Sequence, residues 1–325
     1  VCVARERSAP CFNCSPCSTV CGWGGAGAFS DGKLTLSTEV GGSLEQYVGE
    51  KHLAELIDYI DQIYIHFGAP EHVYGLEHEE EIDDMKRRAV LAELKLVPVR
   101  IRHMGTGRCK ELLQRMYEYL VSRGVEVRTS CQVGEILVKD NTARGVTCQD
   151  GKAIEARFVV MAPGREGARW LGREALRIGL ENSINPVDIG VRVELPAAVM
   201  EPLTRIFYEA KLIYYSRTFN DRIRTFCMNP NGEVVLENND GLVTVNGHSH
   251  AFNKTENTNF AVLVSKTFTE PFKDPIAYGR YIASLANVLG GGVLVQSLGD
   301  LLSGHRSTVE RLAKCMTLPT LNEAT

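Results

Sequence analysis

The sequence has no long hydrophobic run and no surplus of basic charge. None of its apolar stretches approaches the ~20 residues that a membrane-spanning helix needs, and no stretch combines the basic and apolar parts of a secretory signal. Its 36 Lys and Arg residues are outnumbered by 40 Asp and Glu residues, which gives a formal net charge of −4. Binding to nucleic acid or to an anionic membrane usually needs a basic patch, so we expect neither partner.

Three catalytic motifs are also absent, namely G-x-S-x-G, H-E-x-x-H and the phosphate-binding P-loop. Their absence argues against a hydrolase or a kinase. The sequence is 44% hydrophobic and 23% charged, a composition typical of globular proteins. Its 325 residues are enough for one large domain or two domains of ordinary size.

Glycine, in contrast, is concentrated near the start, where Gly22 to Gly27 satisfy the dinucleotide-binding pattern G-x-G-x-x-G. The context argues against that turn, because a cysteine–proline loop precedes it and no helical pattern follows it. Clustered glycines still allow backbone amides to approach a flat or anionic ligand. A flexible surface loop is the alternative, and the aromatic residues Trp23 and Phe29 argue against it.

Cysteine is concentrated in the same region, with five of the ten cysteines in the first 21 residues. Cys11, Cys14, Cys17 and Cys21 have the spacing of a bacterial ferredoxin run, with Gly22 in place of the usual proline. The spacing predicts a metal site, either a [4Fe–4S] cluster or zinc; a redox-active dithiol and plain reduced thiols are the alternatives. Thiols gathered at one end of a long chain indicate a reducing compartment, so we expect a cytoplasmic protein.

The hydrophobic periodicity of the first half predicts helices followed by strands. Ser43 and Gln46 fit a capping box for a helix that ends at Gly68, and the charge run at 77–88 fits a solvated helix face. A further helix is expected over 106–123.

Strands follow this helix at hairpin spacing, the last of them ending in an apolar run. Residues 125–128 read as a short strand, and 133–138, 143–148 and 154–161 as a three-stranded meander. The apolar run at 158–162 predicts a strand buried in a parallel sheet. This order is that of the second half of an FAD-binding domain of the glutathione-reductase type.

From Asn185 the pattern changes to alternating strands. They are expected at 187–195, 206–215, 223–228, 233–236, 242–246 and 260–267. A helix is expected to begin at Asp274–Pro275. The predicted fold is therefore α/β. By their resemblance to the layout of FAD-binding domains, residues 1–184 are expected to form a partial Rossmann-like FAD/NAD(P)-binding domain with a three-stranded β-meander, and 185–325 an inserted, mostly antiparallel α+β substrate domain.

Several longer segments carry a specific resemblance. They are GWGGAGAFSDGKLTLSTEVGG (22–42), IRHMGTGRC (101–109), VVMAPGREGARW (159–170), VDIGVRVELPA (187–197), TFCMNPNGEVV (225–235), TVNGHSHA (244–251) and KTENTNFAVLVS (254–265). With them the chain resembles, over essentially its whole length, a family of FAD-dependent dehydrogenases whose members are mostly uncharacterised.

The resemblance implies which residues hold the flavin. The loop at 22–33 would lie near the isoalloxazine ring, and the segment at 161–167 would close the site from the sheet side. The implied cofactor-binding residues are Gly22, Gly24, Gly25, Gly27, Ser30, Lys33, Ala162, Gly164 and Gly167.

The chain departs from the family pattern at both ends. Family members begin with a strand, a glycine turn and a helix, and they finish with a Gly-Asp segment that holds the pyrophosphate and flavin. Neither is visible here, so the resemblance implies a fragment that lacks both parts.

Three residues are the candidates for catalysis, namely Lys33, His103 and His248. Such side chains can stabilise charge on the flavin or the substrate, or act as a general acid or base; a structural hydrogen bond is the alternative for each histidine. The expected reaction is hydride transfer between flavin N5 and a small-molecule substrate, with an unidentified electron donor or acceptor. The alternative is a metal-binding or iron–sulfur module built on the cysteine loop, without flavin.

Overall fold

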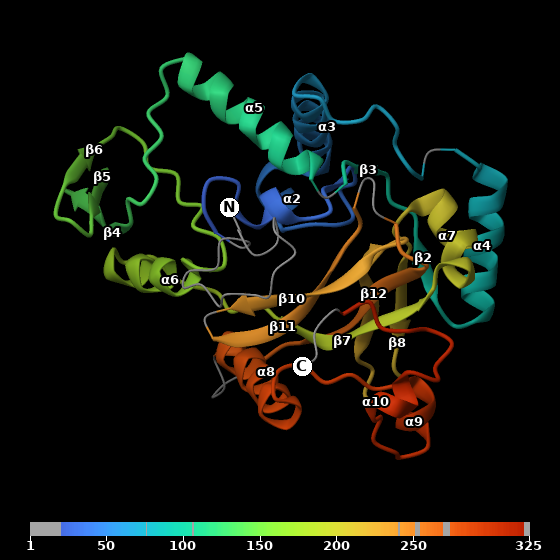
Figure 1. Ribbon diagram of the computed structural model, residues 1–325. Helices are drawn as coiled ribbons and strands as arrows, with labels where there is room; N and C mark the ends of the chain where they lie inside the picture. The colour runs from blue at the N-terminus through green and yellow to red at the C-terminus, as the bar shows by residue number, and fades with distance from the viewer. Residues whose placement is uncertain are drawn as a thin grey trace.

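The computed structural model describes residues 21–75, 77–105, 107–239, 241–250, 254–268 and 274–321. The strands in these ranges form a mixed α/β structure of small sheets, and their strand pairs are all antiparallel (Figure 1). No helix in these ranges is long and apolar enough to cross a membrane.

The largest sheet has five strands. Their order is β2 (Lys95–Val97), β8 (Lys211–Tyr215), β9 (Arg222–Asn229), β12 (Asn257–Lys266) and β7 (Val187–Pro196). The alternating pattern after Asn185 thus does form antiparallel strands. Because β2 pairs with β8, the sheet takes strands from both sides of the boundary expected at 184/185.

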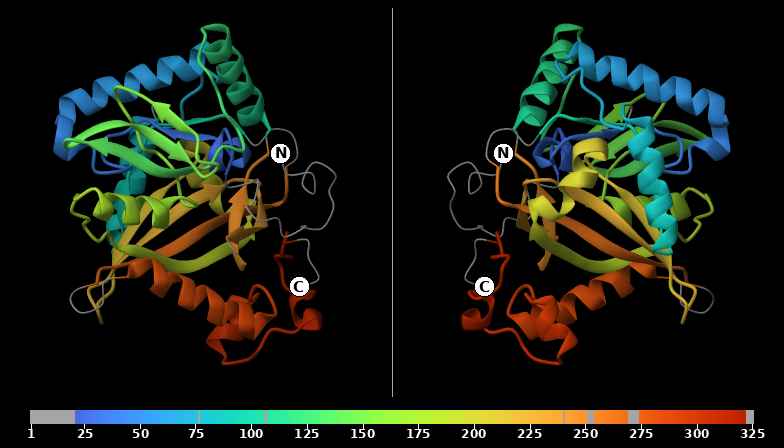
Figure 2. Two further views of the ribbon diagram at one scale, coloured as in Figure 1. Left: turned by 90° about the vertical axis from the view of Figure 1, so that its left-hand side faces the viewer. Right: turned by 90° about the vertical axis from the view of Figure 1, so that its right-hand side faces the viewer.

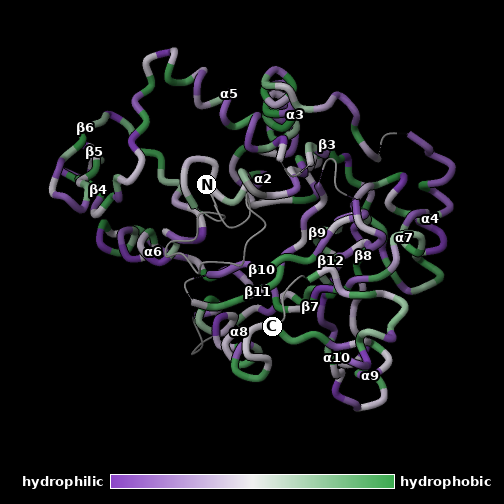
Figure 3. Tube along the Cα trace, in the orientation of Figure 1, coloured by the Kyte–Doolittle hydropathy of each residue, from purple (hydrophilic) through white to green (hydrophobic). Residues whose placement is uncertain are grey.

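Two helices cover one face of this sheet, α4 (Glu79–Leu91) and α7 (Ala197–Phe207) (Figure 1). The core between them and the sheet consists of Ile82, Ala89, Leu96, Met200, Ile206, Phe207, Ala210 and Met228. The outer face of α4 is the charge run, and the helix is largely hydrophilic in Figure 3. The strand expected at 206–215 is correct only for its second half, because Phe207 still belongs to α7.

A hairpin of β10 (Glu233–Asn239) and β11 (Leu242–His248) lies beside this sheet. Helix α8 (Pro275–Gly290) packs against β7 and β11 and begins where expected, with the Asp274 side chain accepting a hydrogen bond from the Ala277 amide. In both views of Figure 2, α8 lies on one side of the sheet, and α3 (Glu50–His66) and α5 (Arg108–Ser122) lie on the other. The short helices α9 (Leu298–Leu302) and α10 (Val309–Leu312) follow α8.

The glycine-rich segment leads into a two-stranded sheet, not into an α-helix. A 3-10 helix η1 (Gly25–Phe29) is followed by β1 (Lys33–Thr35), which pairs with β3 (Ile101–His103). This agrees with the sequence context that argued against a dinucleotide turn. The capping box was wrong: α2 (Glu45–Val48) begins after Leu44 without a side-chain cap.

The three-stranded meander is present, with β4 (Val133–Lys139), β5 (Thr142–Cys148) and β6 (Ala153–Glu155), but its third strand is much shorter than the 154–161 expected. Helix α6 (Ala168–Arg177) docks on β4, where the Trp170 indole donates to the Gly134 carbonyl at 2.7 Å.

Two strands expected around the meander are not formed. Residues 125–128 are not a strand, and the run at 158–162 is irregular, with Phe158 76% and Val160 90% exposed. A strand buried on both faces needs a ladder partner, and none of the described strands pairs with this run. The parallel, Rossmann-like part of the expected fold is therefore not formed by the described residues.

Candidate functional site

Two of the three predicted catalytic residues lie directly opposite each other. In the antiparallel pair of β1 and β3, Lys33 is the register partner of His103. Gly32, at φ 71°, allows β1 to pass close beneath α5, because a Cβ atom there would lie 2.2 Å from the Cys109 sulfur. Residues 70 positions apart in the sequence are thus brought to one place by a three-residue strand pair.

Lys33 is the centre of a buried ionic network. Its Nζ lies 2.6 Å from a Glu209 carboxylate oxygen and 3.1 Å from Asp31 Oδ2, and it donates to the Met228 carbonyl at 2.8 Å. Glu209 also pairs with Lys211. We call the six residues of this network and the adjoining aromatic pair the Lys33 cluster: Asp31, Lys33, His103, Tyr208, Glu209 and Lys211.

The charges in this cluster balance one another. Burial opposes the charged form of Lys33, but the carboxylates of Asp31 and Glu209 outweigh it and raise the pKa of Lys33 above its ordinary value. Burial likewise opposes ionisation of Glu209, yet Lys33 and Lys211 lower its pKa to about 2. Both side chains are therefore charged at neutral pH, and each neutralises the other.

His103 and Tyr208 form a neutral pair beside this network. The Tyr208 hydroxyl lies 2.7 Å from His103 Nε2, and the two rings stack with centroids 4.0 Å apart. Burial, together with the charges of Lys33 and Lys254, lowers the pKa of His103 to about 3. The imidazole is therefore neutral at physiological pH, and burial also raises the pKa of Tyr208, so the hydroxyl keeps its proton and the two side chains form a hydrogen-bonded pair without charge.

Two residues of this region have an unusual backbone. Tyr208 has φ 59° with ψ −53°, and Cys227, whose sulfur lies 3.8 Å from Lys33 Nζ, has φ 49°. Such conformations are costly for residues with a Cβ, and they concentrate at functional sites. Both residues lie near Lys33, which is consistent with a functional role for the cluster.

The depressed pKa of His103 predicts a specific acid sensitivity. Between about pH 6.5 and 3 the unfolded chain binds a proton at His103 that the folded chain does not, so stability falls as pH falls, by roughly 1.4 kcal/mol per pH unit. His103→Gln should remove this slope between pH 6.5 and 4.5. Urea unfolding across that range measures it, and an unchanged slope in the variant would contradict the assignment.

A second polar group adjoins the cluster on the large sheet. Arg192 Nη1 donates to Asn259 Oδ1 at 2.5 Å and to the Cys227 carbonyl at 3.1 Å, and Asn229 Nδ2 donates to both of the same acceptors. Gly247 makes room for these side chains, because a Cβ atom there would lie 2.2–2.4 Å from all three. Arg192 Nε, Asn229 Oδ1 and Asn259 Nδ2 remain buried without a hydrogen-bond partner.

The third predicted catalytic residue, His248, lies at the buried end of β11, with its ring centroid 6.4 Å from that of His250. His250 Nε2 lies 2.7 Å from Glu233 Oε1. The next residue, Ser249, is fully buried; its hydroxyl donates to the Pro230 carbonyl at 2.8 Å, and its side chain acts on the pKa of Tyr208. The β11 end therefore borders the Lys33 cluster through Ser249.

A pocket of about 770 Å³ lies over the turn that the resemblance assigned to the flavin. Its lining includes Ala162, Gly164 and the first residue of α6. Gly167 is the N-cap of α6, where a Cβ atom would lie 2.4 Å from the Pro163 Cβ. Gly167 supplies no side-chain cap, and the amide of Ala168, the first residue of α6, donates to the Arg165 carbonyl at 3.2 Å, so an anionic group at this end would use the amides that follow it.

A line of polar contacts connects this turn with the Lys33 cluster. Arg165 donates to Glu237 at 2.9 Å, and Asn246 Nδ2 donates to the same carboxylate at 3.4 Å. Asn246 Oδ1 in turn accepts from the Cys227 sulfur at 3.9 Å, and Cys227 contacts Lys33. The predicted sheet-side residues and the predicted catalytic lysine thus belong to one connected region.

The predicted flavin-side glycines divide into two groups. Gly22, Gly25 and Gly27 face open space, since a Cβ atom on any of them would meet nothing within 4 Å. Gly24 is a packing position, with Leu113 Cδ1 2.7 Å from its would-be Cβ. Ser30 closes the turn, donating to the Gly27 carbonyl at 3.1 Å.

The cysteine prediction falls mainly outside the described residues. Cys11, Cys14 and Cys17 lie there, and Cys21 is the first residue described. From Cys21 onward, the described ranges contain no group of three His, Cys, Asp or Glu side chains that could hold a metal ion.

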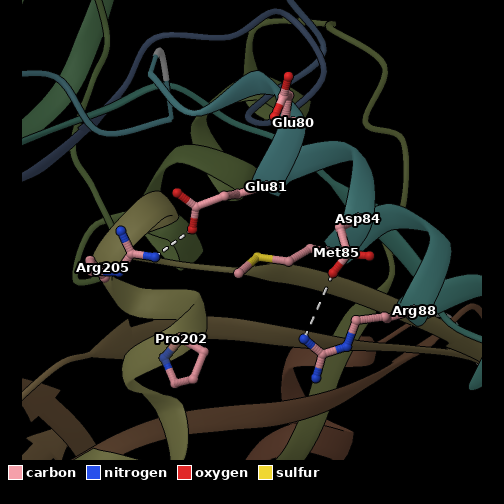
Figure 4. A pocket seen from close by; sticks show the side chains of 7 residues that line it. All are labelled: Glu80, Glu81, Asp84, Met85, Arg88, Pro202 and Arg205. Atoms are coloured by element: carbon pink, nitrogen blue, oxygen red, sulfur yellow. Dashed lines mark hydrogen bonds and ion pairs between the residues drawn. The ribbon is translucent and has the colours of Figure 1, made fainter.

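A second pocket, of about 400 Å³, lies between α4 and α7 (Figure 4). Four of its charged residues form two pairs, Glu81 with Arg205 and Asp84 with Arg88, while Met85 and Pro202 provide apolar surface. The Glu81–Arg205 pair connects α4 with α7, whereas Asp84 and Arg88 both lie on α4. None of the predicted site residues lies here.

Sequence reasoning missed four of the six residues of the Lys33 cluster, namely Asp31, Tyr208, Glu209 and Lys211. It also missed the neighbouring residues Arg192 and Asn229. A signal existed for Glu209, an acidic residue within the otherwise apolar and aromatic run at 206–210. It was not recognised because this run was taken as a strand.

Comparisons with known proteins point to flavin chemistry. Residues 55–192 match the family model described as flavin containing amine oxidoreductase. An uncharacterized protein of Clostridium beijerinckii is 28% identical over 310 residues, which cover 88% of this chain and 50% of that protein. The chain thus spans about half the length of the curated relative it matches.

Glycine oxidase from Bacillus cereus is 14% identical over 85% of this chain and 89% of its own, with a TM-score of 0.30. That score is too low to support any structural conclusion. The family match over 55–192 is the finding that supports an FAD-dependent oxidoreductase, and it agrees with the cofactor implied by the sequence motifs.

Proposed function

We propose that this chain is part of an FAD-dependent dehydrogenase, in which it forms one wall of the flavin site and supplies polar residues beside the reacting groups. The observation that carries the proposal is the family match, because residues 55–192 include His103, the pocket turn and α6. The substrate is a small molecule, and a separate electron donor or acceptor completes the reaction.

The residues present fit one face of the cofactor. The pocket volume of about 770 Å³ is in the range of small-molecule sites. Its small side chains at Ala162 and Gly164 allow close approach to the backbone, and the start of α6 suits a phosphate. Gly22, Gly25 and Gly27 leave a second open surface for a flat ring.

Bound FAD would supply hydride transfer at its N5 position. The chain's own contribution is the Lys33 cluster. Lys33 uses its hydrogen-bonding capacity on Asp31, Glu209 and a backbone carbonyl, so we assign it an electrostatic role. Its charge helps to keep His103 neutral, and the neutral imidazole then holds the Tyr208 hydroxyl in place at 2.7 Å.

Filling the pocket tests the proposal. Gly172 lines it on α6, has an ordinary helical backbone, and has only Asn182 Nδ2, at 3.9 Å, near its would-be Cβ. Gly172→Leu should therefore fold and should weaken FAD binding at least tenfold, about 1.4 kcal/mol. Flavin fluorescence titration and the absorption spectrum of the purified protein measure this.

Gly299→Leu is the matched control, because Gly299 is also helical, has open space at its Cβ and lies on α9, outside the pocket lining. It should leave flavin binding unchanged. Both variants are made in the full-length protein, because this chain is proposed to form only one wall of the flavin site. If neither the full-length parent nor its Gly299→Leu variant binds FAD, the proposal is wrong. If Gly172→Leu binds FAD as the parent does, this pocket is not the flavin site.

A further inference from the structure

Two cysteines outside the predicted site lie unusually close together. The sulfurs of Cys131 and Cys148 are 2.9 Å apart, at the open end of the hairpin formed by β4 and β5. An S–S bond is about 2.05 Å long, so the two atoms need to approach by only about 1 Å. We propose that Cys131 and Cys148 are a reversible thiol–disulfide pair that staples this hairpin when a small-molecule disulfide is present.

The backbone holds both cysteines in place. Ser130, at φ 54°, turns the chain just before Cys131, and the Gln149 amide donates to the Gln132 carbonyl at 2.8 Å. The residues that follow the two cysteines are thus hydrogen-bonded to each other. Formation of the bond therefore needs no rearrangement of the sheet.

The two thiols also differ in access, which sets the order of the steps. Cys131 is half-buried, whereas Cys148 is only 3% exposed. The pKa of the Cys148 thiol is raised, first by its contact with Cys131 and then by burial, which disfavours Cys148 as the first nucleophile. Exchange therefore begins at Cys131.

The chemistry balances as two successive exchanges. The Cys131 thiolate attacks one sulfur of a disulfide such as oxidised glutathione, which forms a mixed disulfide and releases one glutathione thiolate. The Cys148 thiolate then attacks the Cys131 sulfur and releases the second glutathione. The protein loses two protons and two electrons, and one glutathione disulfide becomes two thiols.

The staple would act on the part of the meander that carries α6. The ring closed by the bond, residues 131–148, contains all of β4, and β4 is where α6 is anchored. Trp170 donates to the Gly134 carbonyl, and Glu174 accepts from the Ile136 amide at 3.0 Å. Helix α6 also lines the pocket of about 770 Å³, so the disulfide would restrain the strand on which one wall of that pocket is anchored.

Peptide mapping tests the proposal directly. The native chain is incubated with oxidised glutathione, its free thiols are alkylated, and it is digested with trypsin without reduction. Cleavage after Arg128, Lys139, Arg144 and Lys152 places the cysteines in peptides 129–139 and 145–152. We expect these two peptides as one linked species, two hydrogens lighter than their sum, which separates again after dithiothreitol.

Cys315 is the internal control, because its sulfur donates to the Arg311 carbonyl at 3.5 Å and not to another thiol, so it should remain open to alkylation. Cys131→Ser and Cys148→Ser should each abolish the linked species, whereas Cys315→Ser should leave it unchanged. Both peptides recovered fully alkylated after oxidation, or Cys131 linked to any cysteine other than Cys148, would overturn the proposal. Because this readout involves no flavin, it is independent of the proposed function.

Discussion

Lys33→Met is expected to lower the free energy of unfolding by about 3–5 kcal/mol, because it leaves buried carboxylates without their cation. Asp31 would lose its ion-pair partner and Glu209 would keep only Lys211. The methionine side chain fills a volume similar to that of lysine, so loss of packing contributes little to the change in stability. Urea unfolding followed by circular dichroism measures the change.

Lys86→Met is the control for this prediction, because Lys86 pairs with Asp83 at 3.0 Å on the exposed face of α4. It should cost less than about 1 kcal/mol. The double variant Lys33→Met/Glu209→Gln should be less destabilised than the sum of its single variants, since it removes one of the stranded charges. Additive effects, or a Lys33→Met variant as stable as the parent, would show that the network is not an ionic unit.

Arg102→Met is expected to have an effect of similar size, about 3–5 kcal/mol. Arg102 is 3% exposed and donates twice to Asp61, at 2.6 and 2.7 Å, and once to the Pro70 carbonyl at 2.5 Å. These bonds tie α3 to β3, one residue before His103. The variant should therefore also disturb the His103–Tyr208 pair.

Arg102→Lys separates the charge from the geometry, because lysine keeps the charge but loses the two-pronged contact. It should recover part of the lost stability and no more. Arg88→Met is the matched surface control, since Arg88 and Asp84 are exposed and 4.0 Å apart. Equal effects at positions 88 and 102 would contradict a buried anchor at Arg102.

The antiparallel strands after Asn185 could be predicted because they are long enough to show alternation. Strands β7 and β12 have ten residues each. The start of α8 could be predicted from Asp274 and Pro275, which are typical of the first positions of a helix. Strands β1, β2 and β3 have three residues each, too few for a period, and none of them was predicted. Their pairing depends on tertiary contacts instead of local pattern.

The apolar run at 158–162 failed for a different reason. Its composition favours a buried strand, but burial requires neighbours on both sides, and the described residues supply none. Helix α7 was not predicted because it contains Pro202 and because its apolar residues are spread over several of its sides, not gathered on one face. Local preference was outweighed by packing in both segments.

Lys33 and His103 could be proposed from motifs, but their partners could not. Tyr208 is 105 positions from His103, and Met228 is 195 from Lys33. No local pattern connects residues so far apart. The ionic network and the neutral pair became visible only when the strands were placed.

The burial of the Lys33 cluster has a consequence for ionic strength. Mobile ions screen exposed charges over about 8 Å at 0.15 M salt and about 3 Å at 1 M, but they have little access to a buried network. Concentrated sodium chloride should therefore weaken surface pairs such as Arg217–Glu93 while leaving the Lys33–Glu209 attraction nearly intact. The buried ion pair of Lys33 and Glu209 would therefore contribute about equally to stability at low and at high salt concentrations.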